Sequence, residues 1–492
     1  MDLEALPGAV AVVVVAVATL AIGTWGLRFS RTTSDFFVAS RTVNPRLNAS
    51  AIGGEYLSAA SFLGIAGLVL TFGADMLWYP VGWTAGYLVL LVLVAAPLRR
   101  SGAYTLPDFA EARLGSRGVR HLCSVVVVAI GWLYLVPQFE GAGITLAAAI
   151  DAPRWVGPLV VGAVVLVNVS SGGMRSITFV QAFQYWLKLT ALLVPVAVLL
   201  VIWAGDGAPR PVTPQDWSMP LLGDGAQGLY STYSLILATF LGTMGLPHVV
   251  VRFYTNPDGR AARRTTLVVL ALLGIFYVLP PLFAMLGRAY GAADADTLVL
   301  ELPRLMTDGV LGDVLTGLVT AGAFAAFLST SSGLAIAVSG VLTQDVTVRR
   351  LPDVTAFRVA AVIAVTVPLA ASLALPDFGV ARAVGLAFAV AASTFCPLLV
   401  LGIWWRGLTA AGAIAGLLVG GAGSVGAVAW TLADDASSGW FDVLLGQPAA
   451  WSVPVAVTAM VVVSRLTART VPAHARRFMV RLHTPEALEL DR

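Results

Sequence analysis

Gly53-Gly54-Glu55-Tyr56-Leu57-Ser58-Ala59-Ala60-Ser61 interrupts an apolar stretch near the N-terminus of this 492-residue chain. Two adjacent glycines, a carboxylate and two hydroxyls are unsuited to a helix that faces lipid. Backbone that is not helical is tolerated at membrane depth only where protein or a water-filled cavity satisfies its N–H and C=O groups. The stretch therefore predicts a broken helix beside a polar cavity near the bilayer midplane, an arrangement typical of membrane carriers.

The composition places the chain in a membrane. Hydrophobic residues make up 58% of it, charged residues only 12%, and the mean hydropathy is +0.86. These values indicate a polytopic membrane protein without a sizeable soluble domain. Apolar runs of roughly 20 residues, enough to cross about 30 Å of hydrocarbon, number thirteen. They lie near 8–27, 49–71, 77–98, 121–149, 155–170, 177–204, 228–251, 266–288, 310–342, 356–375, 380–404, 409–432 and 449–465.

The distribution of basic residues predicts the orientation. The first run follows Asp2 and Glu4 rather than a basic segment, so it is expected to remain as an anchor. With thirteen crossings, 24 of the 30 Lys and Arg residues fall on the C-terminal side of the membrane. By the positive-inside rule the C-terminus is cytoplasmic and the N-terminus outside, in a multi-pass protein of the cell inner membrane. These arginines suit anionic lipid headgroups, and nothing indicates nucleic-acid binding.

Three ionisable residues lie inside apolar runs, where a charge is costly and by default indicates function: Glu55, Glu140 and Lys188. Lys188 is the only lysine in the chain, and Glu140 is its natural partner if the fourth and sixth runs touch. Such a pair is either a structural ion pair or a set of coupling charges, in which one member changes protonation during transport. Glu55 is interpreted as a carboxylate that is hydrogen-bonded by its own loop or reaches a vestibule.

The ninth run carries four consecutive hydroxyls, Ser329-Thr330-Ser331-Ser332. Hydroxyls in a membrane helix most often bond back to carbonyls one turn earlier. A hard cation such as sodium needs several oxygen ligands, and a helix supplies them as a carbonyl and hydroxyls one turn apart. The hydroxyls therefore indicate either helix packing or, if this helix meets the broken second run, an ion site.

The seventh run contains a second predicted break. Gly242, Gly245 and Pro247 interrupt the hydrogen-bond ladder at mid-run. Five runs separate this break from the one in the second run. Matching breaks in two five-helix halves are the signature of an inverted-repeat secondary transporter, which binds solute and ions between the half-helices.

These residues resemble the sodium/solute symporter family, which has a leucine-transporter-like fold. The resemblance extends from Ser34-Asp35-Phe36-Phe37 to about residue 405 and is closest to the acetate and monocarboxylate permease branch. The other motifs that carry it are Glu55-Tyr56-Leu57-Ser58-Ala59-Ala60-Ser61-Phe62-Leu63-Gly64, Tyr104-Thr105-Leu106-Pro107-Asp108, Gly245-Leu246-Pro247-His248 with Arg252-Phe253, and Val384-Gly385-Leu386-Ala387-Phe388.

The resemblance implies an all-α polytopic membrane protein of about thirteen transmembrane helices, with a 5+5 inverted repeat and discontinuous helices. The expected segments are an extra helix and cytoplasmic linker (1–47), the first repeat (48–204), an extracellular loop (205–227), the second repeat (228–405), two additional helices (406–465) and a cytoplasmic tail (466–492), expected to be partly disordered.

The family's sodium site maps to five residues of this chain. They are the carbonyls of Gly54, Leu57 and Ala326 and the hydroxyls of Ser329 and Thr330. The Ser-Thr pair resembles sodium-coupled members, so sodium is the expected coupling ion. Two positions depart from that pattern. Thr178 stands where several relatives have an acidic residue, which argues against a second sodium. Lys188 flanks the site and could replace the ion with its own charge, which leaves proton coupling as the alternative.

The branch resemblance implies a small monocarboxylate as the solute, such as acetate, propionate or pyruvate, and free amides at half-helix N-termini suit a carboxylate. The predicted cavity residues are Glu55, Tyr56, Ser58, Gln138, Phe240, Thr243 and Met244. A negative Glu55 would repel an anion, so an amino acid such as proline remains an alternative solute. No cofactor is expected beyond the coupling ion.

Other functional classes fit less well. A membrane-embedded enzyme needs a catalytic cluster, yet the four histidines, His121, His248, His474 and His483, form no metal-ligand spacing. A sensor would need a signalling domain, which the short tail does not provide. An ion channel remains open, although the paired helix breaks favour a carrier. Cys123 and Cys396 fall in apolar runs and are expected to be packing residues.

Overall fold

The computed structural model describes residues 6–26, 28, 39–211, 217, 225–346, 353–374, 379–433 and 439–486. Throughout these residues the secondary structure is helical, without a β-strand, as the sequence predicts. The motif Ser34-Asp35-Phe36-Phe37, which begins the family resemblance, lies outside the described residues, and so does part of the predicted loop 205–227.

The first half of the chain runs from the N-terminal helix to the long helix α9. Its elements are α1 (Leu6–Gly26), η3 (Ala39–Arg41), α3 (Pro45–Tyr56), the π-helical turn η4 (Ala60–Gly64), α4 (Ile65–Phe72), η5 (Gly73–Leu77), α5 (Trp78–Val89), the π-helical turn η6 (Leu90–Val94), α6 (Ala95–Ser101), α7 (Leu106–Leu114), α8 (Arg117–Ile150) and α9 (Val156–Gly205).

The second half repeats the alternation of long and short helices. Its elements are α11 (Gly225–Gly245), α12 (Pro247–Val251), η7 (Arg252–Thr255), α13 (Gly259–Tyr277), α14 (Leu279–Ala289), α15 (Leu298–Met306), α16 (Gly309–Val341), the π-helical turn η8 (Leu342–Val346), α17 (Asp353–Ala374), α18 (Val380–Trp404), α19 (Ala410–Ala433), α20 (Trp440–Gly446), α21 (Ala449–Leu466), η9 (Ala468–Thr470) and α22 (Ala475–His483).

Eleven helical stretches of the described chain are long and apolar enough to cross a membrane, and two of them double back. In α9, Gly173 leaves the helical conformation (φ 58°, ψ −167°). Asn168 and Val180, about 18 Å apart in a straight helix, both lie against Gly23 of α1. In the stretch 60–101, the carbonyl of Trp83 returns to within 3.5 Å of the Tyr56 hydroxyl. The described residues therefore make the thirteen predicted crossings.

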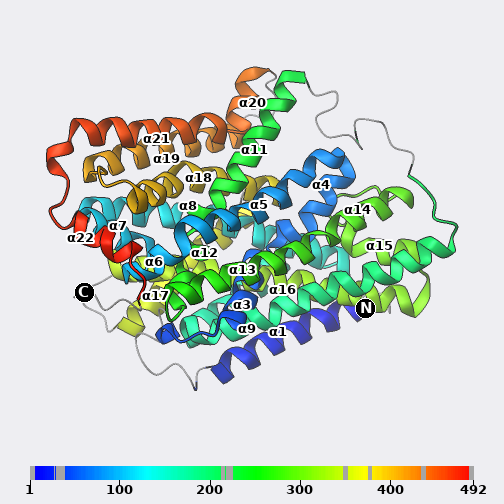
Figure 1. Cartoon of the computed structure of the whole chain (residues 1–492). Coiled ribbons are helices and arrows are strands. Elements are labelled where there is room, and N and C mark those ends of the chain that lie inside the picture. Colours follow the sequence, from blue (N-terminus) through cyan, green and yellow to red (C-terminus); the bar gives the residue numbers. More distant parts are fainter. Residues whose placement is uncertain are drawn as a thin grey trace.

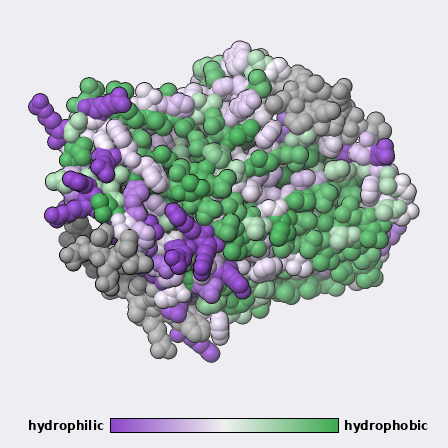
Figure 2. Space-filling model, in the orientation of Figure 1, coloured by the Kyte–Doolittle hydropathy of each residue, from purple (hydrophilic) through white to green (hydrophobic). Residues whose placement is uncertain are grey.

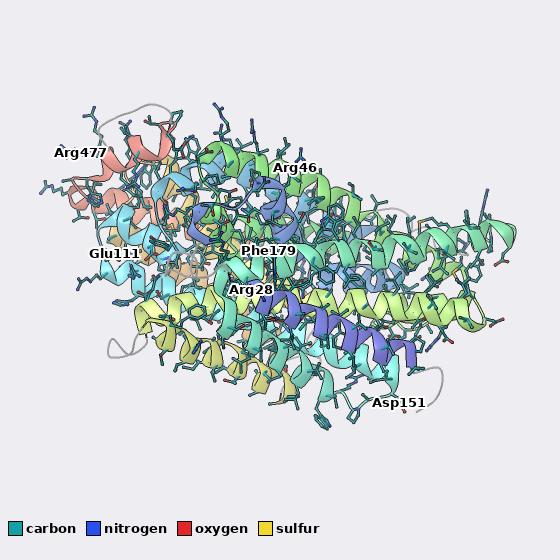
Figure 3. The ribbon with its side chains drawn as sticks, turned by 90° about the horizontal axis from the view of Figure 1, so that it is seen from below. Arg28, Arg46, Glu111, Asp151, Phe179 and Arg477 are labelled. Atoms are coloured by element: carbon teal, nitrogen blue, oxygen red, sulfur yellow. The ribbon has the colours of Figure 1, made fainter. Side chains whose placement is uncertain are left out.

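An odd number of crossings puts the two ends of the chain on opposite sides. In Figure 1 the helices run across the view, with the N-terminus at the right-hand end and α22 at the left-hand end. Figure 2 shows hydrophobic side chains over the middle of this face and hydrophilic ones gathered mainly at the α22 end. In Figure 3, Glu111 and Arg477 lie at the α22 end and Asp151, which follows α8, lies at the other.

The first helix break lies within the predicted stretch 53–61 but not at its two glycines. Gly53 and Gly54 are helical, and α3 ends at Tyr56, after which Leu57 leaves the helical conformation (φ −73°, ψ 87°). The glycines serve close packing instead, because a Cβ on Gly54 would come within 2.1 Å of the Gln181 carbonyl oxygen. The helix resumes at η4 after Ser58 and Ala59, so the predicted interruption exists but is made by Leu57 and Ser58.

The second break coincides with the prediction. Helix α11 ends at Gly245, Leu246 is extended (φ −71°, ψ 119°), and Pro247 begins α12. Proline lacks the N–H that would continue the ladder and is well suited to the first turn of a new helix. A Cβ on Gly245 would meet the Ala391 carbonyl oxygen of α18 at 2.3 Å. The glycine therefore lets the break pack directly on α18.

The described part of the C-terminal tail packs on the transmembrane body. Helix α22 contacts α6, α7 and α18, and its exit is held by Glu486, which accepts hydrogen bonds from the Gly259 N–H (2.8 Å) and Arg100 (3.2 Å). Burial raises the pKa of Glu486, but these hydrogen bonds and the charge of Arg100 outweigh it and lower that pKa overall. The tail is thus attached to the transmembrane body by a carboxylate that is charged at neutral pH.

Candidate solute and cation site

The two broken helices face each other. The Tyr56 hydroxyl, at the end of α3, lies 2.7 Å from the Thr243 hydroxyl near the end of α11. Glu55 forms an ion pair with Arg252, which begins η7 just after α12, at 2.6 Å. Helix α3 also packs against α9 and α16. The breaks, α9 and α16 therefore enclose one polar region in the interior of the helix bundle.

Glu55 and Arg252 are both almost fully buried, with side chains 2% and 1% exposed. The expectation that Glu55 is held by its own loop or reaches a vestibule is wrong, because its partner comes from the other broken helix. Arg252 is one of the 24 basic residues that the sequence assigned to the C-terminal side of the membrane, and its closeness in sequence to Arg260, Arg263 and Arg264 concealed this pairing. Removing one member of such a pair leaves an uncompensated buried charge, which costs about 3–5 kcal/mol.

Arg252 also binds two side chains of α9. Its guanidinium donates to the Thr178 hydroxyl (2.9 Å) and to the Gln181 side-chain carbonyl, and the Gln181 amide donates to the Ser329 carbonyl (2.8 Å). Thr178, noted in the sequence as a departure from the family's acidic residue, thus lies beside a fixed cation. The chain of bonds connects the two breaks to α9 and α16.

Lys188 is fully buried on α9. Its ammonium donates to the carbonyls of Gly54 and Leu57 (2.7 Å to Leu57) and to the hydroxyl of Ser329 (2.8 Å). The predicted pair with Glu140 is not formed, although α8 and α9 do pack together. Glu140 is only half-buried, whereas Lys188 lies at the first helix break.

The structure brings all five residues of the predicted sodium site together. Ser329 donates to the Ala326 carbonyl at 3.1 Å, and Thr330 donates to the Glu55 carbonyl at 2.6 Å. Gly54 and Leu57 face them across the break, where both bind Lys188. Of the four hydroxyls in the ninth run, those of Ser331 and Ser332 are buried without a hydrogen-bond partner among the described groups.

The predicted cavity residues surround the break but differ in exposure. Ser58, Thr243 and Met244 are buried, and Phe240 is half-buried. Gln138 of α8 accepts a hydrogen bond from the Ala59 N–H at 3.0 Å, so it satisfies one of the amides freed where the helix is interrupted. Gln138, one of the predicted cavity residues, therefore lies directly at the first helix break.

An aromatic cluster that the sequence did not indicate covers the same region. The Tyr56 ring lies 4.8 Å from Tyr87 and 6.2 Å from Phe388, and Trp83 lies 5.6 Å from Phe388. The Trp83 indole N–H, the Tyr87 hydroxyl and both ring nitrogens of His248 are buried without a hydrogen-bond partner among the described groups. Buried polar groups are normally bonded, so these are candidate contacts for a bound solute.

His248, which the sequence analysis considered only as a metal ligand, is fully buried. Its ring lies 5.4 Å from that of Tyr134. One sequence signal could have marked His248 as a site residue. It directly follows Pro247, and the first turn of a helix that begins after a break lies next to that break. For Trp83 and Tyr87 no local signal exists, since aromatic residues are common throughout the apolar runs.

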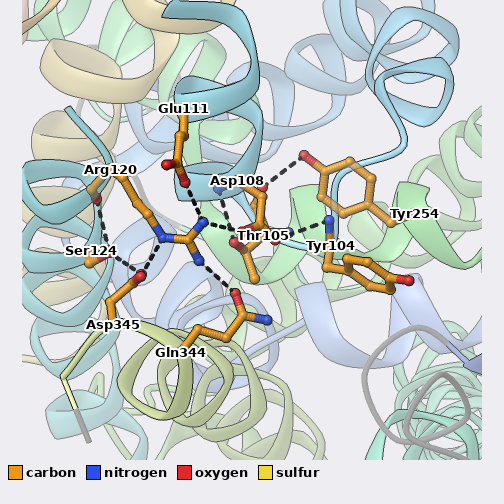
Figure 4. Close-up of polar contacts among 9 residues, drawn as sticks. All are labelled: Tyr104, Thr105, Asp108, Glu111, Arg120, Ser124, Tyr254, Gln344 and Asp345. Atoms are coloured by element: carbon orange, nitrogen blue, oxygen red, sulfur yellow. Dashed lines mark hydrogen bonds and ion pairs between the residues drawn. The ribbon is translucent and has the colours of Figure 1, made fainter. Parts of the chain in front are cut away.

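Figure 4 shows a separate charged cluster. Its Glu111 lies at the same end of the molecule as Arg477 of α22 in Figure 3. Arg120 of α8 pairs with Asp108 (2.9 Å) and Glu111 (2.7 Å) of α7 and with Asp345 of η8. Asp345 also accepts from Ser124 at 2.5 Å. Asp108 belongs to the capping box of α7, with Thr105. The cluster ties the α7–α8 corner to the end of α16.

Two interrupted helices that face each other inside a thirteen-crossing bundle define a multi-pass membrane protein with a leucine-transporter-like fold. Residues 36–420 match the model of the Sodium:solute symporter family. The chain therefore belongs to this family. It is 31% identical over 422 residues, 82% of each chain, to the "Uncharacterized symporter YwcA" of Bacillus subtilis (strain 168).

Two solved structures share the fold. A Na+-coupled sialic acid symporter superposes with a TM-score of 0.70 at 15% identity, covering 94% of this chain and 98% of that one. MHP1, a nucleobase-cation-symport-1 family transporter, gives a TM-score of 0.56 at 14% identity, covering 92% and 99%. At these identities the similarity extends to the fold alone.

Proposed function

We propose that this symporter takes up a small monocarboxylate of the acetate, propionate and pyruvate class together with a cation, by alternating access. The solute binds between the two helix breaks, where freed backbone amides suit a carboxylate. The branch resemblance supports this solute class. The basic residues support an orientation in the cell membrane with the α22 end in the cytoplasm and the N-terminus outside.

The observation that carries the solute class is the Glu55–Arg252 pair. A free carboxylate would repel an anion and attract the ammonium of an amino acid. Because Arg252 neutralises Glu55, Lys188 leaves one net positive charge among these three buried side chains. A monoanion balances that charge, whereas the ammonium of a proline-like zwitterion finds no free carboxylate among them.

The proposed solute contacts are the predicted cavity residues apart from Glu55, with three additions. Trp83, Tyr87 and His248 supply buried donors that have no partner within the described part of the chain, and neutral donors in an apolar cluster bind a carboxylate strongly because water does not compete. The aromatic rings favour a solute with a short apolar tail, as acetate, propionate and pyruvate have.

Uptake of radiolabelled solutes into proteoliposomes tests the proposal. We expect saturable accumulation of pyruvate and acetate, and none of proline. Tyr87→Phe should raise KM without lowering stability, because its hydroxyl has no protein partner to lose. Tyr185→Phe is the matched control, since its hydroxyl donates to the Leu272 carbonyl (3.0 Å); it should lower stability by about 1 kcal/mol and leave KM unchanged. Accumulation of proline, or a flux that does not saturate, would contradict the proposal.

A further inference from the structure

We infer that the ammonium of Lys188 takes the place of the sodium ion expected from the family, so that uptake by this chain does not depend on sodium. The inference deepens the proposed function and rests on it for the solute. It concerns the five predicted sodium ligands on α3 and α16 and the single lysine of the chain on α9.

The hydrogen bonds show that the lysine uses the ligands themselves. A lysine ammonium has three N–H donors and no acceptor. Lys188 directs all three at oxygens, namely the Gly54 carbonyl, the Leu57 carbonyl and the Ser329 hydroxyl. Because the Ser329 hydroxyl donates its own hydrogen to Ala326, it accepts from Lys188. Three acceptors match a protonated amine, so a positive charge lies where the ion was expected.

The remaining ligands are also engaged. Thr330 donates to the Glu55 carbonyl, and the Ala326 carbonyl receives the Ser329 hydroxyl. A sodium ion bound to the Gly54 and Leu57 carbonyls would lie within a few ångströms of the Lys188 nitrogen, and two like charges at that distance repel strongly in a buried site. Sodium therefore does not fit these residues while Lys188 is present.

The neighbouring charges keep Lys188 in this position. The charged groups near it are Glu55 and Arg252, which neutralise each other, so no free carboxylate draws the ammonium away. Gln181 links Arg252 to the Ser329 carbonyl and fixes the hydroxyl that Lys188 binds. The ammonium joins the break of α3 to α9 and α16, which is the contact that a bound cation would make.

Thermal unfolding of the purified protein in detergent tests the inference without a transport assay. In the wild type we expect the same Tm in sodium, potassium and choline chloride. Lys188→Ala removes the ammonium and leaves the oxygens, so its Tm should rise specifically in sodium chloride. A sodium-specific rise in the wild type, or none in Lys188→Ala, would overturn the inference. If Lys188→Ala does not fold, the wild type alone still decides, and Lys188→Met, which keeps the length of the side chain, replaces it.

A matched pair of serines on α16 locates the effect. Adding Ser329→Ala to Lys188→Ala should abolish the sodium response. Adding Ser339→Ala should not, because the Ser339 hydroxyl bonds only back to Ala335 of its own helix (2.5 Å). A response that survives Ser329→Ala would place sodium elsewhere and contradict the inference.

Uptake of pyruvate by the wild type in proteoliposomes provides the second measurement. We expect the rate to be unchanged when choline replaces sodium, and accumulation to follow an inward proton gradient in sodium-free medium. Uptake that requires a sodium gradient would refute the inference. If no monocarboxylate is taken up under either gradient, the proposed solute is wrong, and the sodium dependence of Tm still tests the role of Lys188 independently.

Discussion

At the residue scale, Gly333 of α16 explains how the buried pair of Glu55 and Arg252 packs against that helix. A Cβ built on Gly333 would come within 2.1 Å of the Glu55 carboxylate oxygen. Glu55 cannot retreat easily, because Arg252 binds it at 2.6 Å. The absence of a side chain at Gly333 is thus required by the carboxylate, not by an unusual backbone conformation.

Gly333→Ala should therefore destabilise the protein. The added methyl overpacks the pair and strains its geometry, which we expect to lower the free energy of unfolding by about 1–3 kcal/mol. Gly340→Ala, two turns further along the same helix, meets nothing within 4 Å and should stabilise by roughly 0.5–1 kcal/mol through helix propensity. Tm values in detergent measure both. Equal shifts in the two variants would show that Glu55 yields without resistance.

Sequence reasoning at this scale singled out Lys188 and Glu55 as costly charges inside apolar runs but did not find their partners. Burial cost depends only on residue type and depth in an apolar run, so a single sequence reveals it. Partners come from other helices: Arg252 for Glu55, and the oxygens of Gly54, Leu57 and Ser329 for Lys188. Nothing in the sequence encodes which helix faces which.

At the element scale, the first break depends on a cap from another helix. Leu57 and Ser58 interrupt the ladder, and the Ala59 N–H is satisfied by Gln138 of α8 at 3.0 Å. A buried amide left unpaired costs about 1–3 kcal/mol. The break is therefore stable only while α8 packs beside it.

Gln138→Leu should both destabilise the protein by about 1–3 kcal/mol and raise KM for the solute, because the half-helix that binds it loses its cap. Gln184→Leu is a matched control. Gln184 is also buried, and its amide donates to Thr19 of α1 at 3.1 Å, away from the break. It should lower stability to a similar extent and leave KM unchanged. Uptake kinetics and Tm separate the two, and an equal change in KM would count against the capping role.

At the scale of the whole molecule, the Arg120 cluster joins α7 and α8 to the end of α16. It lies beyond the C-terminal end of α16, in the part of the molecule that carries α22, where Figure 3 labels Glu111 and Arg477. Alternating access requires one end of the bundle to open at a time. Contacts at this end therefore set how readily it opens.

Arg120→Gln should loosen this end, and a native cysteine can report it. Cys123 is fully buried on α8, next to Ser124, which binds Asp345. If the cluster contributes about 1.4 kcal/mol to closure, loss of Arg120 raises the maleimide labelling rate of Cys123 about tenfold. Cys396, buried on α18, provides the internal control. Arg117→Gln, an exposed arginine at the start of the same helix, should change neither rate. Unchanged Cys123 labelling in Arg120→Gln would exclude this role.

By itself the sequence determined the crossings, the two helix breaks and the presence of costly charges between them, because hydropathy, proline and glycine act over a few residues. The first break lies within the predicted stretch, although Gly53 and Gly54 themselves remain helical and pack against α9. Only the tertiary structure decided that Arg252 neutralises Glu55 and that Lys188 occupies the predicted sodium ligands. The physical reason is distance: electrostatic and hydrogen-bond partners act across about 3 Å of space, while the chain separates Lys188 from Gly54 by 134 residues.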